Sequence, residues 1–241
     1  FILPTRVARG PRIEAGDCLL SFNFRKDRPR QTLSAFLQPD FTHFDRGAFS
    51  PVEVTGMMRY DQTYEMPIAF DHESPGVTLG KILSDAGIRQ FHCAETEKYP
   101  HVTFYFNGGH SEPLPGEDQY LIPSPRVDTY DLKPEMSAPE VATAVVEALG
   151  RQEYPFIVVN FANGDMVGHT AVREAVIAAV EALDREVGRV LDAAVAAGYA
   201  IILTADHGNC DEMVDPVTPT THTQHTLSPV PCLVIAPVPW N

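Results

Sequence analysis

Short apolar runs and one long amphipathic segment set the predicted order of strands and helices. Apolar residues follow one another without helical spacing in three runs, which predicts buried strands at residues 18–24, 156–161 and 200–204. Apolar positions at helical spacing predict helices at residues 32–37, 78–86, 141–149 and 170–197. The order strand, helix, strand over residues 156–204 predicts a βαβ unit, with a right-handed crossover and two parallel strands in a covered sheet.

Capping residues and breakers mark where these elements end. Ser137 and Glu140 fit a capping box in front of the third helix. Residues 108–127 are rich in glycine and proline, which predicts a long loop. Residues 38–75 show weak helical periodicity, and we place a domain hinge at residues 72–75. Three glycines follow predicted helices as stop signals: Gly87, Gly150 and Gly198.

Composition and charge limit the classes of protein to which this chain can belong. Hydrophobic content of 44% and charged content of 21% are typical of a globular chain, and no uncharged apolar stretch reaches the ~18 residues of a membrane span. A formal charge of −14 disfavours nucleic acid and anionic membranes as partners. The cysteines show no C-x-x-C spacing, so we expect reduced thiols in a cytoplasmic protein. The abrupt start at Phe1 and the stop soon after an apolar run lead us to expect a fragment.

The first chemical segment follows the strand at residues 156–161. Asp165 and His169 lie four residues apart there, and a helical turn would put carboxylate and imidazole on one face, able to chelate one cation. Ligands of parallel sheets bind at such carboxyl ends of strands. The alternative is structural, with Asp165 capping the next helix and His169 packed beside it.

Two further segments bring candidate metal ligands. Asp206 and His207 follow the strand at residues 200–204, and would serve one metal through a turn or help to hold a pair of cations. His222 and His225 precede the apolar run CLVIA; we take His225 as a ligand and His222 as a structural residue. Mixed Asp and His ligands favour Mn²⁺ or Zn²⁺ over Ca²⁺.

A basic segment stands out in this acidic chain. Arg25 and Arg28 follow the strand at residues 18–24, where guanidinium groups held by a rigid strand end would suit bidentate capture of phosphate. A solvated basic face is the alternative. Lys98 heads a short, partly aromatic helix and by its sequence alone would be assigned to the surface.

Six motifs, in order, make the chain resemble the cofactor-independent phosphoglycerate mutase family of the alkaline phosphatase superfamily. They run through nearly the whole sequence: FNFRKDR (22–28), AETEKYPHVTFYFNGG (94–109), PSPRVDTYDLKPEMSA (123–138), NFANGDMVGHT (160–170), TADHGN (204–209) and HTQHTLSPVP (222–231). The departures from the family pattern are mild, and Gly164 stands where proline would be usual.

The resemblance implies the fold and the domain organisation. We expect an α/β fold with a mostly parallel sheet flanked by helices, alkaline-phosphatase-like, with part of a second α/β domain at the N-terminus. Residues 1–72 would be the end of a phosphotransferase-like, substrate-binding domain, and residues 73–241 a phosphatase-like metal-binding domain that is incomplete at its C-terminus.

The resemblance also implies the chemistry. The family interconverts 3-phosphoglycerate and 2-phosphoglycerate through a phosphoserine, with two Mn²⁺ or similar ions (Zn²⁺, Co²⁺ or Mg²⁺), as a cytoplasmic, usually monomeric enzyme of glycolysis. Asp165, His169 and His225 would hold one metal, and Asp206 and His207 would help to hold the second. Arg25 and Arg28 would bind substrate, and Lys98 would assist the phosphoryl group.

Other interpretations stay open. The family's nucleophilic serine belongs to an N-terminal half that has no matching segment here, so we expect this chain alone to be inactive. It would then be a non-catalytic metal-binding fragment. A different phosphatase or a phosphopentomutase of the same superfamily is a further alternative, which the first and third motifs disfavour.

Overall fold

The protein is described from a computed structural model. Residues 13–47, 52–61, 63–71, 76–214, 218 and 220–237 are described. The chain divides into two compact units, Phe1–Ser74 and Pro75–Asn241. The hinge expected at residues 72–75 lies outside the described residues.

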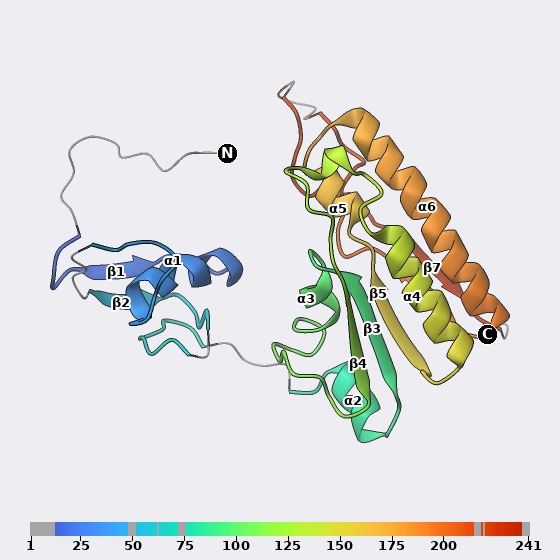
Figure 1. The fold of residues 1–241 in the computed structure, drawn as a ribbon, viewed down its shortest axis with the longest axis horizontal. Coiled ribbons are helices and arrows are strands. Elements are labelled where there is room, and N and C mark those ends of the chain that lie inside the picture. The colour runs from blue at the N-terminus through green and yellow to red at the C-terminus, as the bar shows by residue number, and fades with distance from the viewer. Residues whose placement is uncertain are drawn as a thin grey trace. The chain divides into compact units, whose positions relative to one another are not determined.

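The first unit contains a small β-α-β arrangement (Figure 1). Strand β1 (Cys18–Ser21) pairs in parallel with β2 (Glu53–Gly56), and helix α1 (Asp27–Leu37) lies between them in sequence. Helix α1 begins five residues before the predicted helix at 32–37, and β1 ends three residues before the predicted end at residue 24. The four-residue β2 was not predicted, because its sequence EVTG contains one valine and forms no apolar run.

A parallel sheet of three strands forms the centre of the second unit. Strand β3 (Gln90–Glu95) lies between β4 (Glu117–Ile122) and β5 (Phe156–Asn160), and both pairings are parallel. The prediction of a long loop at residues 108–127 is wrong, since β4 occupies part of it. Strand β4 pairs with β3 alone in this sheet, and its polar sequence EDQYLI gives little sign of burial.

The two faces of β3 differ, because successive side chains of a strand point to opposite faces. Phe91 and Cys93 join the main core, whereas the imidazole of His92 donates a hydrogen bond from Nδ1 to the Val102 carbonyl oxygen, 2.7 Å away, on short helix α3 (Tyr99–Val102). Helix α2 (Leu79–Asp85) begins at its N-cap Thr78, close to the predicted start.

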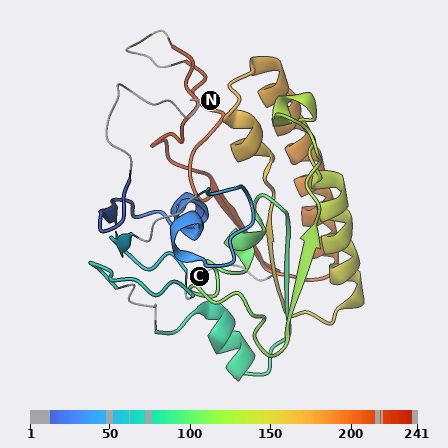
Figure 2. The same ribbon diagram turned by 60° about the vertical axis from the view of Figure 1, so that its left-hand side comes forward.

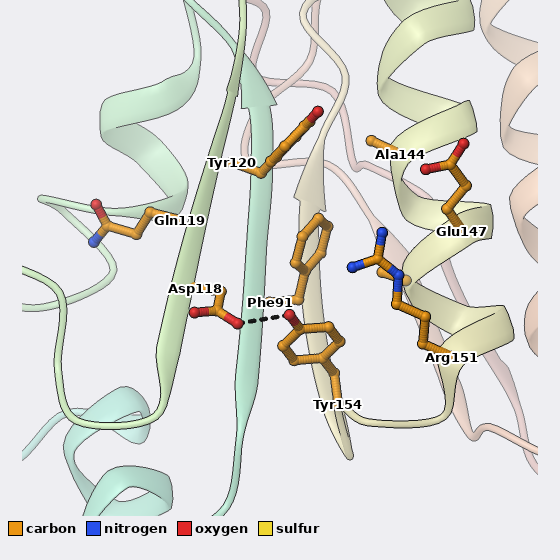
Figure 3. A pocket seen from close by; sticks show the side chains of 9 residues that line it. Phe91, Asp118, Gln119, Tyr120, Ala144, Glu147, Arg151 and Tyr154 are labelled. Carbon is orange, nitrogen blue, oxygen red and sulfur yellow. Dashed lines mark hydrogen bonds between the residues drawn. The ribbon is translucent and has the colours of Figure 1, made fainter.

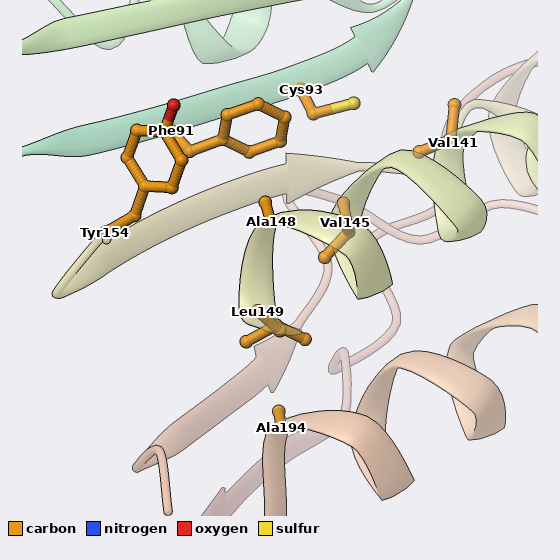
Figure 4. Close-up of a cluster of buried hydrophobic side chains, with 8 residues drawn as sticks. All are labelled: Phe91, Cys93, Val141, Val145, Ala148, Leu149, Tyr154 and Ala194. Carbon is orange, nitrogen blue, oxygen red and sulfur yellow. The ribbon is translucent and has the colours of Figure 1, made fainter. Parts of the chain in front are cut away.

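Two long helices cover the core face of the sheet. Helices α4 (Ala138–Arg151) and α6 (Arg173–Ala196) run side by side (Figures 1 and 2), and both were predicted within a few residues. Side chains of β3, α4, α6 and the loop between α4 and β5 form the main core, which Figure 4 shows: Phe91, Cys93, Val141, Val145, Ala148, Leu149, Tyr154 and Ala194. Each is at most 7% exposed, so this core supplies the main hydrophobic stabilisation of the unit.

The ends of α4 differ from the prediction. The Ser137 hydroxyl donates to the Pro123 carbonyl oxygen at 2.8 Å, so it makes no capping box with Glu140. Gly150 lies inside the helix, which continues to Arg151 and ends at Gln152 in the left-handed region, with φ +53°. The hydrogen bond from Ser137 to the loop at Pro123 therefore replaces the predicted cap at the start of α4.

The last two strands form a separate pair. Strand β6 (Ile201–Thr204) pairs antiparallel with β7 (Cys232–Ile235). The prediction that the strands at 156–161 and 200–204 share one parallel sheet is wrong for the described residues, where β5 pairs with β3. Ile201 still packs against the main core, together with Ile157 of β5. The apolar pattern thus predicts burial of a strand without fixing its neighbour. Within the described ranges, no helix has the length and apolar character needed to cross a membrane.

Candidate metal centre

A short helix at the carboxyl end of β5 carries the first two candidate ligands. Helix α5 (Asn163–Gly168) starts three residues after β5 ends, with Asp165 in its first turn and His169 as its C-cap. The backbone N–H of His169 donates to the Asp165 carbonyl oxygen at 3.1 Å, which is the helical i, i+4 bond. The predicted helical turn is therefore present, and it places carboxylate and imidazole on one side.

His225 joins this pair from far along the chain. Asp165 Oδ1 lies 3.0 Å from His169 Nε2 and 2.9 Å from His225 Nε2, and the two Nε2 atoms are 3.2 Å apart. Around a cation with bonds of about 2.1 Å, neighbouring ligand atoms lie roughly 3.0–3.4 Å apart. One oxygen and two nitrogens are thus gathered at the spacing that a small divalent cation requires.

A backbone contact sets the tautomer of His169. Its Nδ1 lies 2.7 Å from the Thr223 carbonyl oxygen, which can only accept, so Nδ1 carries the proton. The lone pair of a neutral His169 is then on Nε2, facing Asp165 and His225. This is the arrangement that orients metal-binding histidines, and it supports the fit of the three residues to a metal.

Lys98 pairs with the other oxygen of Asp165. Its Nζ lies 2.6 Å from Asp165 Oδ2, and the two side chains are only 6% and 13% exposed. Burial acts to raise the pKa of Asp165, but the hydrogen bond and charge of Lys98, with His169 and Asn209, hold the pKa at about 2. Asp165 is therefore a carboxylate at neutral pH. The expectation of a surface position for Lys98 is wrong, because the turn before α3 directs it inward.

Asp206 and His207 lie beside this group and do not complete it. The His207 ring stacks on the His225 ring, with centroids 3.5 Å apart, and His207 Nε2 lies 3.7 Å from Asp165 Oδ1. The Asp206 side chain is 51% exposed, and its Oδ2 is 3.6 Å from His207 Nε2. Among the residues that the structure describes, the group of three spaced for one cation is Asp165, His169 and His225.

Arg25 and Arg28 belong to the first unit. Arg25 lies in the turn between β1 and α1, where its backbone N–H donates to Asn23 Oδ1 at 2.8 Å, and Arg28 lies in the first turn of α1. Both are exposed. The expectation that a strand end holds them is wrong, because β1 stops at Ser21 and the basic segment enters a helix.

Asn209 is the site residue to which the sequence assigned no role. Its Nδ2 donates to Asp165 Oδ1 at 3.1 Å. Asn209 forms part of the motif TADHGN, and its position two residues after the candidate ligand His207 is the feature of the sequence that could have pointed to it. The spatial contact with Asp165 spans 44 positions of sequence and could not be predicted from it.

A separate cavity of about 220 Å³ lies between β4 and α4 (Figure 3). Its wall includes Asp118, Tyr120, Arg151 and Tyr154, and Asp118 accepts a 2.6 Å hydrogen bond from the Tyr154 hydroxyl. None of the residues that line it is a predicted site residue. The cavity and the ligand cluster are therefore different places on the second unit.

Comparisons with known proteins show the family to which this chain belongs. Residues 61–239 match the metalloenzyme superfamily, and residues 1–62 match the N-terminal region of BPG-independent phosphoglycerate mutases. A 2,3-bisphosphoglycerate-independent phosphoglycerate mutase of Symbiobacterium thermophilum is 51% identical over 98% of this chain and 46% of its own. The chain belongs to the cofactor-independent phosphoglycerate mutase family of the metalloenzyme superfamily.

Other members of the phosphoglycerate mutase family are similarly close. The enzyme of Wolinella succinogenes is 52% identical over 98% of this chain and 48% of its own length. A solved phosphoglycerate mutase from Leishmania mexicana, described at low cobalt concentration, has a TM-score of 0.82 and 36% identity over 93% of this chain and 43% of that one. The resemblance and the α/β fold class are thus confirmed. The chain spans about half the length of the curated relatives it matches.

Proposed function

We propose that this chain is part of a phosphoglycerate mutase that interconverts 3-phosphoglycerate and 2-phosphoglycerate in the cytoplasm. The observation that carries the proposal is the cluster of Asp165, His169 and His225 in a chain of this family. The transferred phosphoryl group spreads negative charge over its oxygens, so its transfer requires cations positioned around it. The cluster and Lys98 offer such positions.

Two divalent cations would act in the complete protein, Mn²⁺ or else Zn²⁺, Co²⁺ or Mg²⁺. Asp165, His169 and His225 would hold one of them, and Asp206 and His207 would contribute to the second. A bound cation would stabilise the charge on phosphoryl oxygens and lower the pKa of a hydroxyl that attacks phosphorus. The mixture of imidazole and carboxylate ligands suits these metals better than Ca²⁺.

The remaining roles fall to cationic side chains. Lys98 is an ammonium with three N–H donors, one of which is directed at Asp165 Oδ2, so two remain for a phosphoryl oxygen. The same contact leaves Asp165 Oδ1 to face the two imidazoles. Arg25 and Arg28 would bind the phosphate or carboxylate of the substrate through their guanidinium forks. Residues 1–72 and 73–241 would be parts of the two domains that carry these groups.

A second candidate function concerns this chain taken alone. The cluster of Asp165, His169 and His225 lies wholly in the unit Pro75–Asn241, whereas the nucleophilic serine expected for the family matches no segment of this sequence. We infer that the 241-residue chain binds metal as a monomer without turning over phosphoglycerate. The activity would belong to the complete protein.

Calorimetric titration with Mn²⁺ tests the centre. The purified chain, Asp165→Ala and His225→Ala are compared, with His222→Ala as a matched control because His222 lies three positions earlier and outside the cluster. We expect saturable binding in the parent and control and its loss in the two ligand variants. Unchanged binding in both ligand variants would overturn the assignment.

Phosphorus NMR of 3-phosphoglycerate tests the activity. The complete protein with both halves is expected to convert it to 2-phosphoglycerate, and to lose this activity on Asp165→Ala substitution. The 241-residue chain is expected to show none. Turnover by the isolated chain would refute the second candidate, and a complete protein inactive with every one of these metals would refute the first.

A further inference from the structure

The segment after β6 is fixed to helix α5 by one asparagine. Asn209 Nδ2 donates to Asp165 Oδ1 at 3.1 Å and lies 3.3 Å from the Asp165 carbonyl oxygen, while Asn209 Oδ1 accepts from the Cys210 backbone N–H at 2.8 Å. The Asp165 oxygens can only accept, and the Cys210 N–H can only donate. The amide therefore has one satisfactory orientation, with its NH₂ group toward Asp165.

This contact requires an unusually close approach of the two segments. A Cβ atom at Gly168 would lie 2.3 Å from Asn209 Oδ1 and 2.6 Å from its Cγ, both far inside van der Waals contact. Gly168 has no positive φ, so its backbone does not require glycine. What requires glycine there is the space that the Asn209 amide occupies.

A second bond holds the same segment in place. The Cys210 thiol donates to the Gly164 carbonyl oxygen at 2.8 Å, and Cys210 itself adopts φ +72°, which is uncommon for a residue other than glycine. Asn209 and Cys210 thus contact α5 at neighbouring positions along the helix. The strained backbone at Cys210 is maintained by the contacts around it.

We propose that Asn209 is a positioning residue of the metal centre, and that Gly168 supplies the space in which it works. The inference rests on the metal centre proposed above. A carboxylate held at one oxygen can still rotate about its Cβ–Cγ bond. Lys98 binds Asp165 Oδ2 and Asn209 binds Oδ1, so the two contacts together fix the carboxylate plane. The free lone pair of Oδ1 then faces His169 and His225.

The same contact joins two ligand segments. Asn209 lies two residues after His207, and His169 follows Gly168 directly. Docking Asn209 against Gly168 therefore brings the segment of Asp206 and His207 against the helix that carries the other ligands. A site whose ligands are already held in place binds a metal ion more tightly, because less free energy is needed to order the ligands on binding.

Four variants of the 241-residue chain test the inference: Asn209→Ala, Gly168→Ala, the double variant, and Gly164→Ala as control. Gly164 lies in the same helix, and a Cβ there meets nothing within 4 Å. The measurements are the Kd for Mn²⁺ by calorimetry and the urea unfolding of the metal-free chain. If Asn209→Ala does not fold, Asn209→Leu replaces it, because leucine keeps about the size of the side chain and has no donor.

Asn209→Ala and Gly168→Ala are each expected to weaken Mn²⁺ binding about 10- to 100-fold, the usual effect of removing a residue that orients a ligand. Adding Gly168→Ala to Asn209→Ala should change the Kd by less than about threefold, because the amide that would clash is already gone. The Gly164→Ala Kd should stay within about twofold of the parent.

Three results would be decisive against these claims. A parent-like Kd in Asn209→Ala, or in Asn209→Leu if that variant is needed, overturns the positioning role while the metal centre stands. Additive effects of Asn209→Ala and Gly168→Ala overturn the role given to Gly168. A parent chain that binds no Mn²⁺ overturns the metal centre itself and the positioning role with it.

Discussion

Substitution of Lys98 by Met should destabilise the folded chain far more than the loss of a surface charge does. Lys98 Nζ lies 2.6 Å from Asp165 Oδ2, with both side chains almost buried. Methionine has nearly the same length and no charge, so the substitution removes the partner of Asp165 while filling its space. The carboxylate then keeps its desolvation and loses its nearest cation.

The structure gives the magnitude of this effect. Folding lowers the pKa of Asp165 from 3.8 to about 2 although burial acts to raise it, and each pH unit corresponds to about 1.36 kcal/mol. The carboxylate therefore gains roughly 2.4 kcal/mol of net stabilisation at neutral pH. Removing one partner of a buried pair costs about 3–5 kcal/mol. We expect Lys98→Met to lower the free energy of unfolding by about 3 kcal/mol at pH 7.

The pH dependence follows from the sign of the shift. A lowered folded-state pKa stabilises the protein fully above 3.8, and that stabilisation is lost as the pH falls toward about 2. The difference between the parent and Lys98→Met should therefore be constant near neutral pH and shrink as the pH falls from about 4 to 2.

Urea unfolding in EDTA measures both quantities and excludes bound metal. Lys81→Met is the matched control, because Lys81 Nζ is 2.5 Å from Asp85 while the side chains are 52% and 63% exposed. This exposed pair should contribute less than about 0.5 kcal/mol. A double-mutant cycle of Lys98→Met with Asp165→Asn should give a coupling energy of about 2–3 kcal/mol. A coupling below about 0.5 kcal/mol would refute the reasoning.

Four further substitutions test burial and helix propensity by urea unfolding. Glu95→Gln should stabilise the chain at pH 7 and less at lower pH, because burial raises the pKa of Glu95 and the amide keeps an acceptor for Ser124; a loss of stability would contradict this. Leu149→Ala should lower the free energy of unfolding by about 2–5 kcal/mol, because Leu149 is buried in the main core. Leu132 is 66% exposed, so Leu132→Ala should change that free energy by no more than about 0.5 kcal/mol. Equal effects of the two substitutions would show that the core is wrongly placed. Gly164→Ala should stabilise the chain by up to about 1 kcal/mol, because alanine favours the helix and its Cβ meets nothing within 4 Å; a lower free energy of unfolding than that of the parent would contradict this.

The sequence predicted the long elements well because their signals are local. Periodic apolar residues over 170–197 placed α6 within a few residues, and the run FIVVN placed β5. The strand β3 escaped notice because its polar residues Gln90, His92 and Glu95 are fully buried, with partners supplied by other elements. Burial of polar groups depends on such distant partners, so no local pattern indicates it.

By itself the sequence determined the residue types of the candidate site and the family of the chain. Asp165 and His169 could be paired from their spacing, because four residues make one helical turn. Only the tertiary structure decided that His225 joins them, that Lys98 is buried against Asp165, and that Asn209 occupies the space left by Gly168. These contacts join residues 41 to 67 positions apart or depend on a close approach between segments, and such distances are set by the packing of the whole unit.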